Sequence, residues 1–522
     1  WNMKKILAIL MFLPVFAGIT SCDQELLETA PTEKVDGPTT FANINSAQVA
    51  MDGVYRLLFV SGWTDGNTHQ NFGILSTNMF TSLMGEDFLQ DQIGNGWFYF
   101  DYRYDVRSRF TSTNWRSYGT WNFYYTLINN VNYIIPQKET IIGDPVLVDN
   151  LIAQALTIRA YSYFQLIQIF QQTYKGHESF PGVPLYTEPT TAQSEGKGRG
   201  TVQEVYDQIN KDLDDAIAMF AKDKSLQTHK SHVDYYIANA IKARVCLVMN
   251  KWDDAVKYSS EALTKPGLTM VSSEAELFSG FNNRNMTGVM WGSEVIADQS
   301  TIYASFYSHM DSEASGMYGA GSRKCIYNWL YDQIPETDVR KQWWNGKLPD
   351  AQVKSSGPNQ SYNQFKYRFS DKAKYLGDYI YMRAEEMVLV KAEALAHAGK
   401  FDEAKTTLES LMKLRNPSGY ADQLASLTNS AAISFTSFGA TTTLMDMILL
   451  QRRIELWGES ERIFDILRQK TGFDRNAPNS NHSQKLNFDT RQPDSKEFIL
   501  TIPQKEFDGN PNLDATADQN PI

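Results

Sequence analysis

Only three cysteines occur in the 522 residues: Cys22, Cys246 and Cys325. Small exported domains that cannot build a sufficient core rely on many disulfides, and three cysteines do not form such a framework in a chain of this size. Cys246 lies in an apolar stretch with helical spacing, and Cys325 is far from it in sequence, so we expect no disulfide framework. Since 42% of the residues are hydrophobic, we expect one large core or two closely packed halves.

Basic charge is also scarce. The chain has 49 Lys and Arg against 60 Asp and Glu, for a net charge of -11. A nucleic-acid-binding domain needs a basic patch to displace counterions from phosphates, and an anionic lipid surface attracts basic segments. The composition therefore argues against nucleic acid as a partner and against direct binding to anionic lipid.

Motifs of catalysis and cofactor binding are missing. The sequence has no G-x-S-x-G nucleophile elbow and no H-E-x-x-H zinc helix. Gly196, Gly198 and Gly200 follow no predicted strand, which argues against a dinucleotide site. Thr201 after them is a candidate helix N-cap. His229 and His232 are the only close pair of histidines, and we expect them in an exposed loop. We therefore expect no cofactor, no metal and no catalytic residue.

A long apolar run is present only at the N-terminus. Lys4 and Lys5 precede the apolar residues 6–16, and small residues then lead to Cys22. This order is typical of a secretory signal that is too short for a membrane span. We interpret residues 1–21 as a lipoprotein signal peptide whose removal leaves Cys22 free to carry lipid. Residues 22–40 are acidic, contain proline and lack periodicity, so we expect a flexible tether.

Helical periodicity dominates from residue 41 onward. Residues 150–170 carry apolar side chains at helical spacing, which predicts one apolar face. Residues 237–263 and 388–411 resemble each other: each has a helix, a tight turn, an aromatic residue and an alanine three positions later. This is the pattern of a tetratricopeptide hairpin. Because the two copies are not in tandem, we expect an all-α fold of interrupted helical hairpins.

Aromatic residues are abundant, at 13% of the chain, and one group follows a predicted turn at residues 94–104. Flat rings pack against the apolar C–H faces of sugars, while Asn, Asp and Arg bind the hydroxyls. With strict alternation, Trp97 and Tyr99 form one half of this group, and Phe98 and Phe100 the other; Tyr102 is a further candidate for the first half. Core packing is the alternative for each ring. Residues 266–376 are loop-rich and aromatic, with a short strand-like run at 289–296, and we expect function there.

Arginines and carboxylates alternate near the C-terminus, in QRRIELWGESERIFDI from residue 451. Each carboxylate has an arginine within one helical turn, an arrangement that favours ionised, paired acids. We therefore interpret Glu455, Glu459 and Asp465 as structural ion-pair partners. The alternative is an acid/base pair.

This C-terminal segment resembles the signature of the SusD/RagB family of nutrient-binding outer-membrane lipoproteins. Further stretches similar to that family occur in the expected order over nearly the whole chain after Cys22. They are Tyr125, Ile128 and Asn132; Arg159, Ala160, Tyr163, Phe164 and Leu166; Gly182 to Leu185; Asp338 and Arg340; Arg383 to Glu385 with Ala392 to Ala394; and Ile502, Pro503, Glu506 and Gln519 to Pro521. The sequence departs from the family pattern at Met412, Gln451, Ser460 and Glu461.

The resemblance implies tetratricopeptide-like helical hairpins with a loop-rich ligand-binding face and minor short strands. Residues 41–522 would form one SusD-like domain, with an N-terminal part to about residue 265 and a C-terminal RagB/SusD part from about residue 266. The family's role implies capture of an oligosaccharide nutrient and its delivery to a SusC-like TonB-dependent transporter. The protein would be anchored to the outer membrane only through lipid on Cys22, facing the exterior.

The resemblance also implies that loops of the aromatic segment 303–329 contribute to ligand binding. Together with the first aromatic group, it predicts five ligand-binding residues: Trp97, Tyr99, Tyr102, Tyr318 and Trp329. We expect a binding protein and not an enzyme. The alternatives are a surface glycoside hydrolase and a tetratricopeptide-type scaffold for protein partners.

Overall fold

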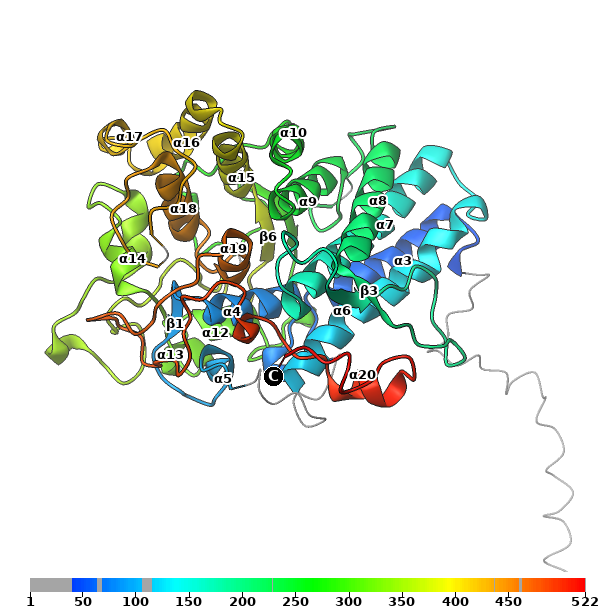
Figure 1. Ribbon diagram of the computed structural model, residues 1–522, viewed down its shortest axis with the longest axis horizontal. Helices are drawn as coiled ribbons and strands as arrows, with labels where there is room; N and C mark the ends of the chain where they lie inside the picture. The colour runs from blue at the N-terminus through cyan, green and yellow to red at the C-terminus, as the bar shows by residue number, and fades with distance from the viewer. Residues whose placement is uncertain are drawn as a thin grey trace, which may run out of the picture.

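The computed structural model describes residues 40–62, 68–105, 115–227, 229–435, 437–459 and 462–521. The predicted signal peptide, Cys22 and the tether up to residue 39 lie outside the described residues. Helices dominate the described chain (Figure 1). The longer helices of the first half are α3 (Ile44–Leu57), α4 (Ile74–Met84), α6 (Trp115–Ile134), α7 (Pro145–Phe170) and α8 (Val202–Phe220).

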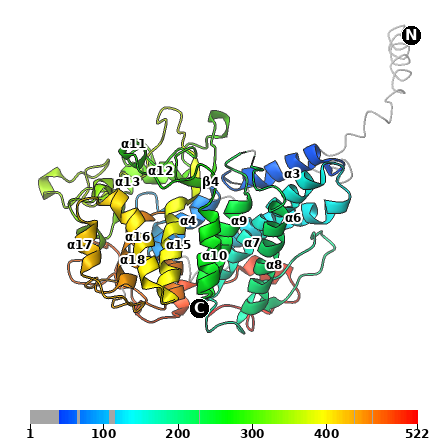
Figure 2. The same cartoon turned by 90° about the horizontal axis from the view of Figure 1, so that it is seen from above.

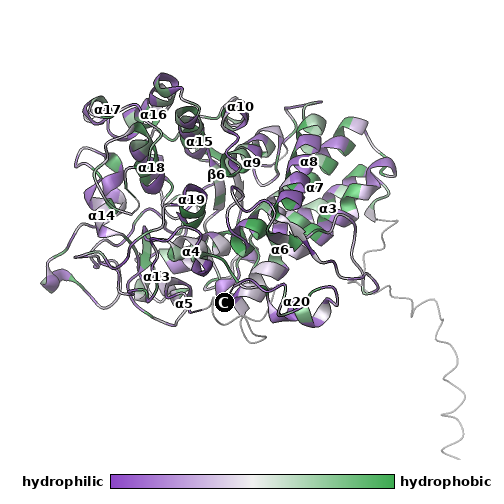
Figure 3. Ribbon diagram, viewed as in Figure 1, coloured by the Kyte–Doolittle hydropathy of each residue, from purple (hydrophilic) through white to green (hydrophobic). Residues whose placement is uncertain are grey.

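Helix α7 is the central element of this half. Asp144 caps its N-terminus through a side-chain hydrogen bond to the amide of Val146, and Pro145 occupies the first turn, where its missing N–H costs nothing. Every residue from Leu151 to Phe170 is buried. The sequence predicted a single apolar face, but α7 packs against α3, α6 and α8 and is therefore covered on nearly all sides. Figure 3 shows hydrophobic (green) and hydrophilic (purple) residues mixed along the helices around α7.

Both predicted hairpins are confirmed. The first consists of α9 (Tyr235–Val248) and α10 (Trp252–Ala262), and the second of α15 (Ala384–His397) and α16 (Phe401–Arg415). Ala255 and Ala404, the alanines of the repeated pattern, are fully buried. Their small side chains let the two helices of each hairpin approach closely.

The two hairpins are neighbours in space although they are not in tandem in sequence. Helix α10 packs against α15, and Figures 1 and 2 both show α9, α10, α15 and α16 in one row. The Trp252 ring stacks on His397, with centroids 4.1 Å apart and planes 13° apart. Lys400 forms an ion pair with Asp253 at 2.9 Å. The interrupted hairpins therefore form a continuous helical layer. The chain between α10 and α15 lies outside this layer.

In the part of the chain that the structure describes, short strands from separate segments pair with each other. They form three antiparallel pairs: β1 (Phe88–Gln90) with β5 (Lys324–Ile326), β2 (Pro181–Pro184) with β3 (Arg199–Thr201), and β4 (Val289–Ser293) with β6 (Tyr379–Arg383). Strand β4 confirms the strand predicted at 289–296. Thr201 is confirmed as the N-cap of α8, in a capping box with Glu204.

Apart from one helix of 12 residues, the remaining elements are short. Those within residues 266–376 are joined by long loops, as predicted. The α-helices are α5 (Tyr99–Tyr102), α11 (Glu274–Leu277), α12 (Phe306–Met310), α13 (Tyr318–Gly321), α14 (Asn328–Asp332), α17 (Tyr420–Ala425), α18 (Leu444–Glu455), α19 (Arg462–Gln469) and α20 (Gln504–Gly509). The 3-10 turns are η2 (Thr68–Gln70), η3 (Ile135–Glu139), η4 (Ala297–Gln299), η5 (Val339–Trp343), η6 (Asp350–Gln352) and η7 (Lys496–Phe498). The chain thus has the predicted all-α fold with minor strands.

Glu455, at the end of α18, lies in a buried ion-pair network. Glu455 is fully buried and contacts Arg415 at 2.9 Å, and Arg340 and Arg383 at 3.2 Å each. Burial by itself raises the pKa of Glu455, but the guanidiniums of Arg415, Arg383 and Arg340 hold it well below its ordinary value. The predicted structural role is therefore confirmed. The partners of Glu455, however, come from distant segments, whereas Asp465 pairs with Arg468 one helical turn away, at 2.8 Å.

Candidate ligand-binding site

Two predicted aromatic segments meet because of the β1–β5 pair. Its register places Phe88 opposite Ile326 and Gln90 opposite Lys324. Just beyond the pair, the Arg323 side chain is fully buried and its Nε donates to Asp91 Oδ2 at 2.7 Å. The turn that follows β1 therefore lies beside the segment that precedes β5.

Glycine is required in that turn. Gly94 has a φ of +51°, and a Cβ atom at this position would lie 1.7 Å from the Ser322 hydroxyl oxygen. Gly96 also has a positive φ, of +86°, and so has Phe98, at +60°. Phe98 donates its backbone N–H to Gln70 Oε1 at 2.6 Å. Only a residue without a side chain allows the first of these approaches. The close packing positions Trp97 between the Gln70 segment and the α13 segment.

Trp97 belongs to a group of rings that we call the Trp97 cluster: Trp97, His69, Tyr318 and Tyr303. The Trp97 and His69 rings stack with centroids 5.0 Å apart and planes 10° apart. The Tyr318 hydroxyl is 2.8 Å from His69 Nδ1, and the Tyr318 ring lies 6.3 Å from Trp97 at an angle of 71°. Tyr303 lies 5.6 Å from Tyr318. The cluster thus joins rings from the turn after β1, from η2 and from the loops around α12 and α13.

The cluster is partly open to solvent. Tyr303 is 44% exposed, and Trp97 and Tyr318 are half-buried. Beneath Tyr318 lies His309, which is buried and stacks on it with centroids 4.8 Å apart. Burial, with a smaller contribution from Lys324, lowers the pKa of His309 well below its ordinary value. His309 is therefore neutral at pH 7, and because its Nε2 lies 2.8 Å from the His69 carbonyl oxygen, Nε2 carries the proton.

Two predicted site residues are covered. Tyr102 is fully buried, its hydroxyl lies 2.9 Å from His482 Nδ1, and Arg475 lies over its ring. Tyr99 is 8% exposed, and its hydroxyl accepts a hydrogen bond from Gln484 Nε2 at 2.5 Å. The expected alternation does not occur, because Tyr99–Tyr102 form the single helical turn α5 and not a strand. Tyr102 offers no ring surface to a ligand in this structure.

The fifth predicted residue, Trp329, lies apart from the Trp97 cluster on α14. It is half-buried, with the Arg453 guanidinium 5.1 Å from its ring centroid and the Phe435 ring 5.6 Å away. Of the five predicted site residues, the structure therefore brings only Trp97 and Tyr318 together. Sequence reasoning did not identify His69, which links them.

The structure gives no basis for a metal centre within the described ranges. No group of three or more His, Cys, Asp and Glu side chains there is placed to hold a metal ion. His229 is exposed as expected, but His232 is buried and stacks on Tyr55 with centroids 4.5 Å apart, so the prediction of an exposed loop was wrong for His232.

Among the helices of the described chain, none combines the length and apolar character that crossing a membrane requires.

Proteins of known structure share this fold. A SusD-like carbohydrate binding protein from Bacteroides vulgatus ATCC 8482 superposes with a TM-score of 0.74 at 23% identity, covering 91% of this chain and 98% of the other. Surface glycan-binding protein A from Bacteroides thetaiotaomicron superposes with a TM-score of 0.67 at 15% identity, covering 92% and 100%. At these identities, the likeness establishes the fold.

Sequence comparison agrees with the structural comparison. SusD-like protein P38 from Formosa agariphila is 22% identical over 508 residues, which span 89% of this chain and 92% of that protein. A family profile described as "Starch-binding associating with outer membrane" matches residues 74–247. A second profile, described as "SusD family", matches residues 280–522. With both halves matched in order and the fold shared, this chain belongs to the SusD/RagB family.

Proposed function

We propose that this protein captures an oligosaccharide at the outer surface of the cell and delivers it to a SusC-like TonB-dependent transporter. The Trp97 cluster is the observation that carries the proposal, because it presents partly exposed rings from three loop segments. Membership of the SusD/RagB family supports glycan as the ligand. Trp97, Tyr318 and Tyr303 would contact the sugar.

The geometry of the cluster suits a saccharide chain. Sugar rings expose apolar C–H faces, and aromatic faces pack against them. Because Trp97 and Tyr318 lie at 71° to each other, they can contact a ligand from two directions. The hydrogen bond between Tyr318 and His69 fixes one of these rings before the ligand binds. A site whose side chains are already ordered loses less conformational entropy on binding.

Substitution of two rings of the Trp97 cluster tests this site. We expect Tyr303→Ala and Trp97→Ala each to weaken oligosaccharide binding by roughly 1–3 kcal/mol, about tenfold or more in affinity, because each removes a stacking surface. A glycan array that includes maltooligosaccharides would identify the best ligand, and calorimetric titration would measure the affinity of each variant.

Phe180→Ala is the matched control, because Phe180 is also exposed, at 46%, but lies outside the cluster. Thermal unfolding of each variant shows whether the fold is retained. Unchanged affinity in both cluster variants would contradict the proposed site. New reducing ends on incubation with polysaccharide would instead support a glycoside hydrolase.

Anchoring and delivery form the second part of the proposal. A polar glycan cannot cross the hydrocarbon core unaided, so a transporter must lie beside a lipid-anchored binder. We expect gentle detergent extraction to recover a large β-barrel protein together with this chain. Cys22→Ala should move the chain from the membrane fraction to the soluble fraction and reduce this recovery. Continued membrane association of Cys22→Ala, without lipid label on the wild-type chain, would contradict the anchor.

A further inference from the structure

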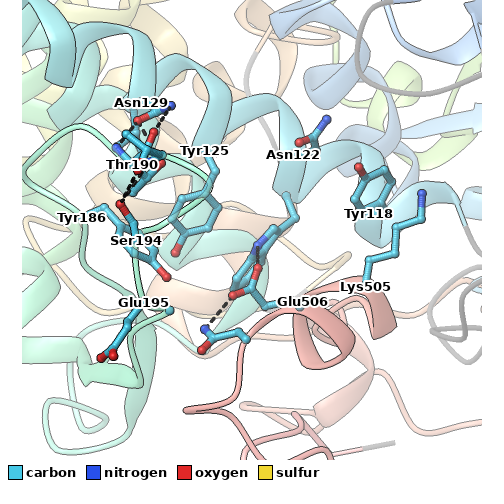
Figure 4. Close-up of a pocket in the computed structure, with 16 residues that line it drawn as sticks. Tyr118, Asn122, Tyr125, Asn129, Tyr186, Thr190, Ser194, Glu195, Lys505 and Glu506 are labelled. Atoms are coloured by element: carbon cyan, nitrogen blue, oxygen red, sulfur yellow. Dashed lines mark hydrogen bonds between the residues drawn. The ribbon is translucent and has the colours of Figure 1, made fainter.

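A concavity lies away from the Trp97 cluster. It has a volume of about 320 Å³ and is lined by α6, by the loop that follows β2 and by α20 (Figure 4). None of the residues of the Trp97 cluster lines it. Figure 1 draws α13 and α20 in different parts of the molecule, and in Figure 2 the red C-terminal segment again lies away from α13. Volumes of about 300–1,000 Å³ are typical of small-molecule sites, so this cavity is large enough for a small ligand.

Aromatic rings form much of the cavity wall. Tyr125 lies 4.9 Å from Trp121 and 5.9 Å from Tyr186, the latter nearly at right angles. The Tyr125 hydroxyl donates to the Pro184 carbonyl at 2.8 Å, which holds its ring in place. Figure 4 shows Tyr125 between Tyr186 on one side and Asn122 and Tyr118 on the other. The wall therefore offers flat apolar surface in fixed positions.

Polar groups at the rim are also held in place. Trp121 Nε1 donates to Glu506 Oε2 at 3.0 Å, and Asn510 Nδ2 donates to Glu506 Oε1 at 2.9 Å. A carboxylate has about four acceptor positions, so two hydrogen bonds leave capacity for ligand hydroxyls. Across the cavity, Asn129 Oδ1 accepts from the backbone and the hydroxyl of Thr190 at 2.8 and 3.0 Å. These contacts connect α6 to both other walls.

The charged residues that line the cavity restrict the class of ligand that can bind there. Glu506 and Glu195 both line the cavity and disfavour an anion there. The one ammonium group in the lining, Lys505 Nζ, lies 3.8 Å from the Tyr118 ring centroid, where it already occupies a cation–π position. A neutral molecule with one apolar face and several hydroxyls matches the rings and the fixed acceptors best.

From this arrangement we propose that the cavity between α6, the 186–196 loop and α20 binds a single neutral sugar ring. The site is a second carbohydrate site, separate from the Trp97 cluster, and it does not depend on glycan capture there. The sugar face packs on Tyr125 and Tyr186, and its hydroxyls donate to Glu506.

Ligand-observed NMR tests the proposal. The probes are the methyl glycosides of glucose, galactose and mannose, added at millimolar concentration to the full purified protein. We expect saturation transfer to the ring protons of at least one probe, and a loss of affinity of about tenfold in Tyr186→Ala and in Glu506→Gln. Asn130→Ala, an exposed residue on the same helix that does not line the cavity, should bind as the wild type does.

A double variant, Trp97→Ala with Tyr303→Ala, separates the two sites. If this variant still binds the probe, and adding Glu506→Gln weakens that binding about tenfold, the second site is supported whether or not the Trp97 cluster binds glycan. Two results overturn the proposal. The first is no saturation transfer from the wild-type protein to any of the three probes, and the second is loss of transfer in the Trp97→Ala/Tyr303→Ala variant, in which the cavity is intact. Stronger binding of inorganic phosphate or ethylammonium than of the sugars also overturns it. Melting temperatures confirm that each variant is folded.

Discussion

Glutamine at position 455 should lower the free energy of unfolding by about 3–5 kcal/mol, the usual cost of removing one partner from a buried ion pair. Three guanidiniums, those of Arg340, Arg383 and Arg415, contact the Glu455 carboxylate, and all four side chains are almost fully excluded from solvent. The arginines also pair with Asp338, Glu385 and Glu459. Glu455→Gln keeps the shape of the side chain but removes one negative charge from this network, which leaves one positive charge uncompensated in a low-dielectric interior. Urea unfolding of both proteins at pH 7 measures the difference.

Asp215→Asn is the matched control, because Asp215 pairs with Lys211 at 2.6 Å on the exposed face of α8. Surface pairs of this kind contribute about 0.3–0.5 kcal/mol. A loss in Glu455→Gln no larger than in this control would show that the buried network does not stabilise the fold.

The pH dependence provides an internal check on the same variant. Because the pKa of Glu455 is held well below its ordinary value of about 4.3, its stabilising contribution is complete above that value and is lost as the pH falls through the folded-state pKa. Glutamine does not titrate. The difference in stability between the two proteins should therefore stay constant above about pH 5 and shrink on further acidification. A constant difference down to the lowest pH at which the wild type is folded would contradict an ionised Glu455.

Trp291→Ala should cost about 3–5 kcal/mol of stability, as expected for emptying a fully buried tryptophan site. Trp291 lies on β4 and packs against Tyr161 of α7 at 5.4 Å and Tyr381 of β6 at 5.0 Å. It therefore joins the N-terminal helices to the C-terminal half. Thermal and urea unfolding measure the loss.

Trp291→Phe separates packing from hydrogen bonding. The indole Nε1 donates to the Ser231 carbonyl at 2.9 Å, and an ordinary hydrogen bond contributes about 1 kcal/mol net. Phenylalanine keeps a ring against Tyr161 and Tyr381, so most of the stability should return. Equal losses in the two variants would mean that the hydrogen bond, and not the packing, is the important contribution.

The elements that the sequence predicted correctly are those that local patterns specify. Thr201 followed by Glu204 marks a capping box within four residues, and the hairpins α9–α10 and α15–α16 follow from helical periodicity around a tight turn. Residues 97–102 show where such reasoning fails. Their aromatic residues suggested alternation, but positive φ angles at Gly96 and Phe98 redirect the chain into a helical turn. The stabilising contacts of that turn come from elsewhere in the fold.

The sequence identified members of the Trp97 cluster only where an aromatic residue of a loop-like segment is also partly exposed in the fold. Trp97 and Tyr318 were identified because they are aromatic residues in loop-like segments. Tyr102 shares that property, yet Arg475 and His482 from the C-terminal region cover it. His69 was missed because a single histidine in an irregular segment has no pattern. Its place beside Trp97 is held by the hydrogen bond from the Phe98 N–H to Gln70 Oε1, and no local sequence pattern predicts a contact between segments so far apart in the chain.

The docking of α10 on α15 has a consequence for the order of assembly. Helix α10 ends at Ala262 and α15 begins at Ala384, so this contact closes a loop that contains the whole β4 and α12–α14 region. Closing a long loop costs conformational entropy that grows with the logarithm of its length, and contacts between residues distant in sequence slow folding. During synthesis the first hairpin emerges well before its neighbour. The half-buried Trp252 stays uncovered until His397 arrives, so the newly made chain has an exposed aromatic face that binding by a chaperone would protect.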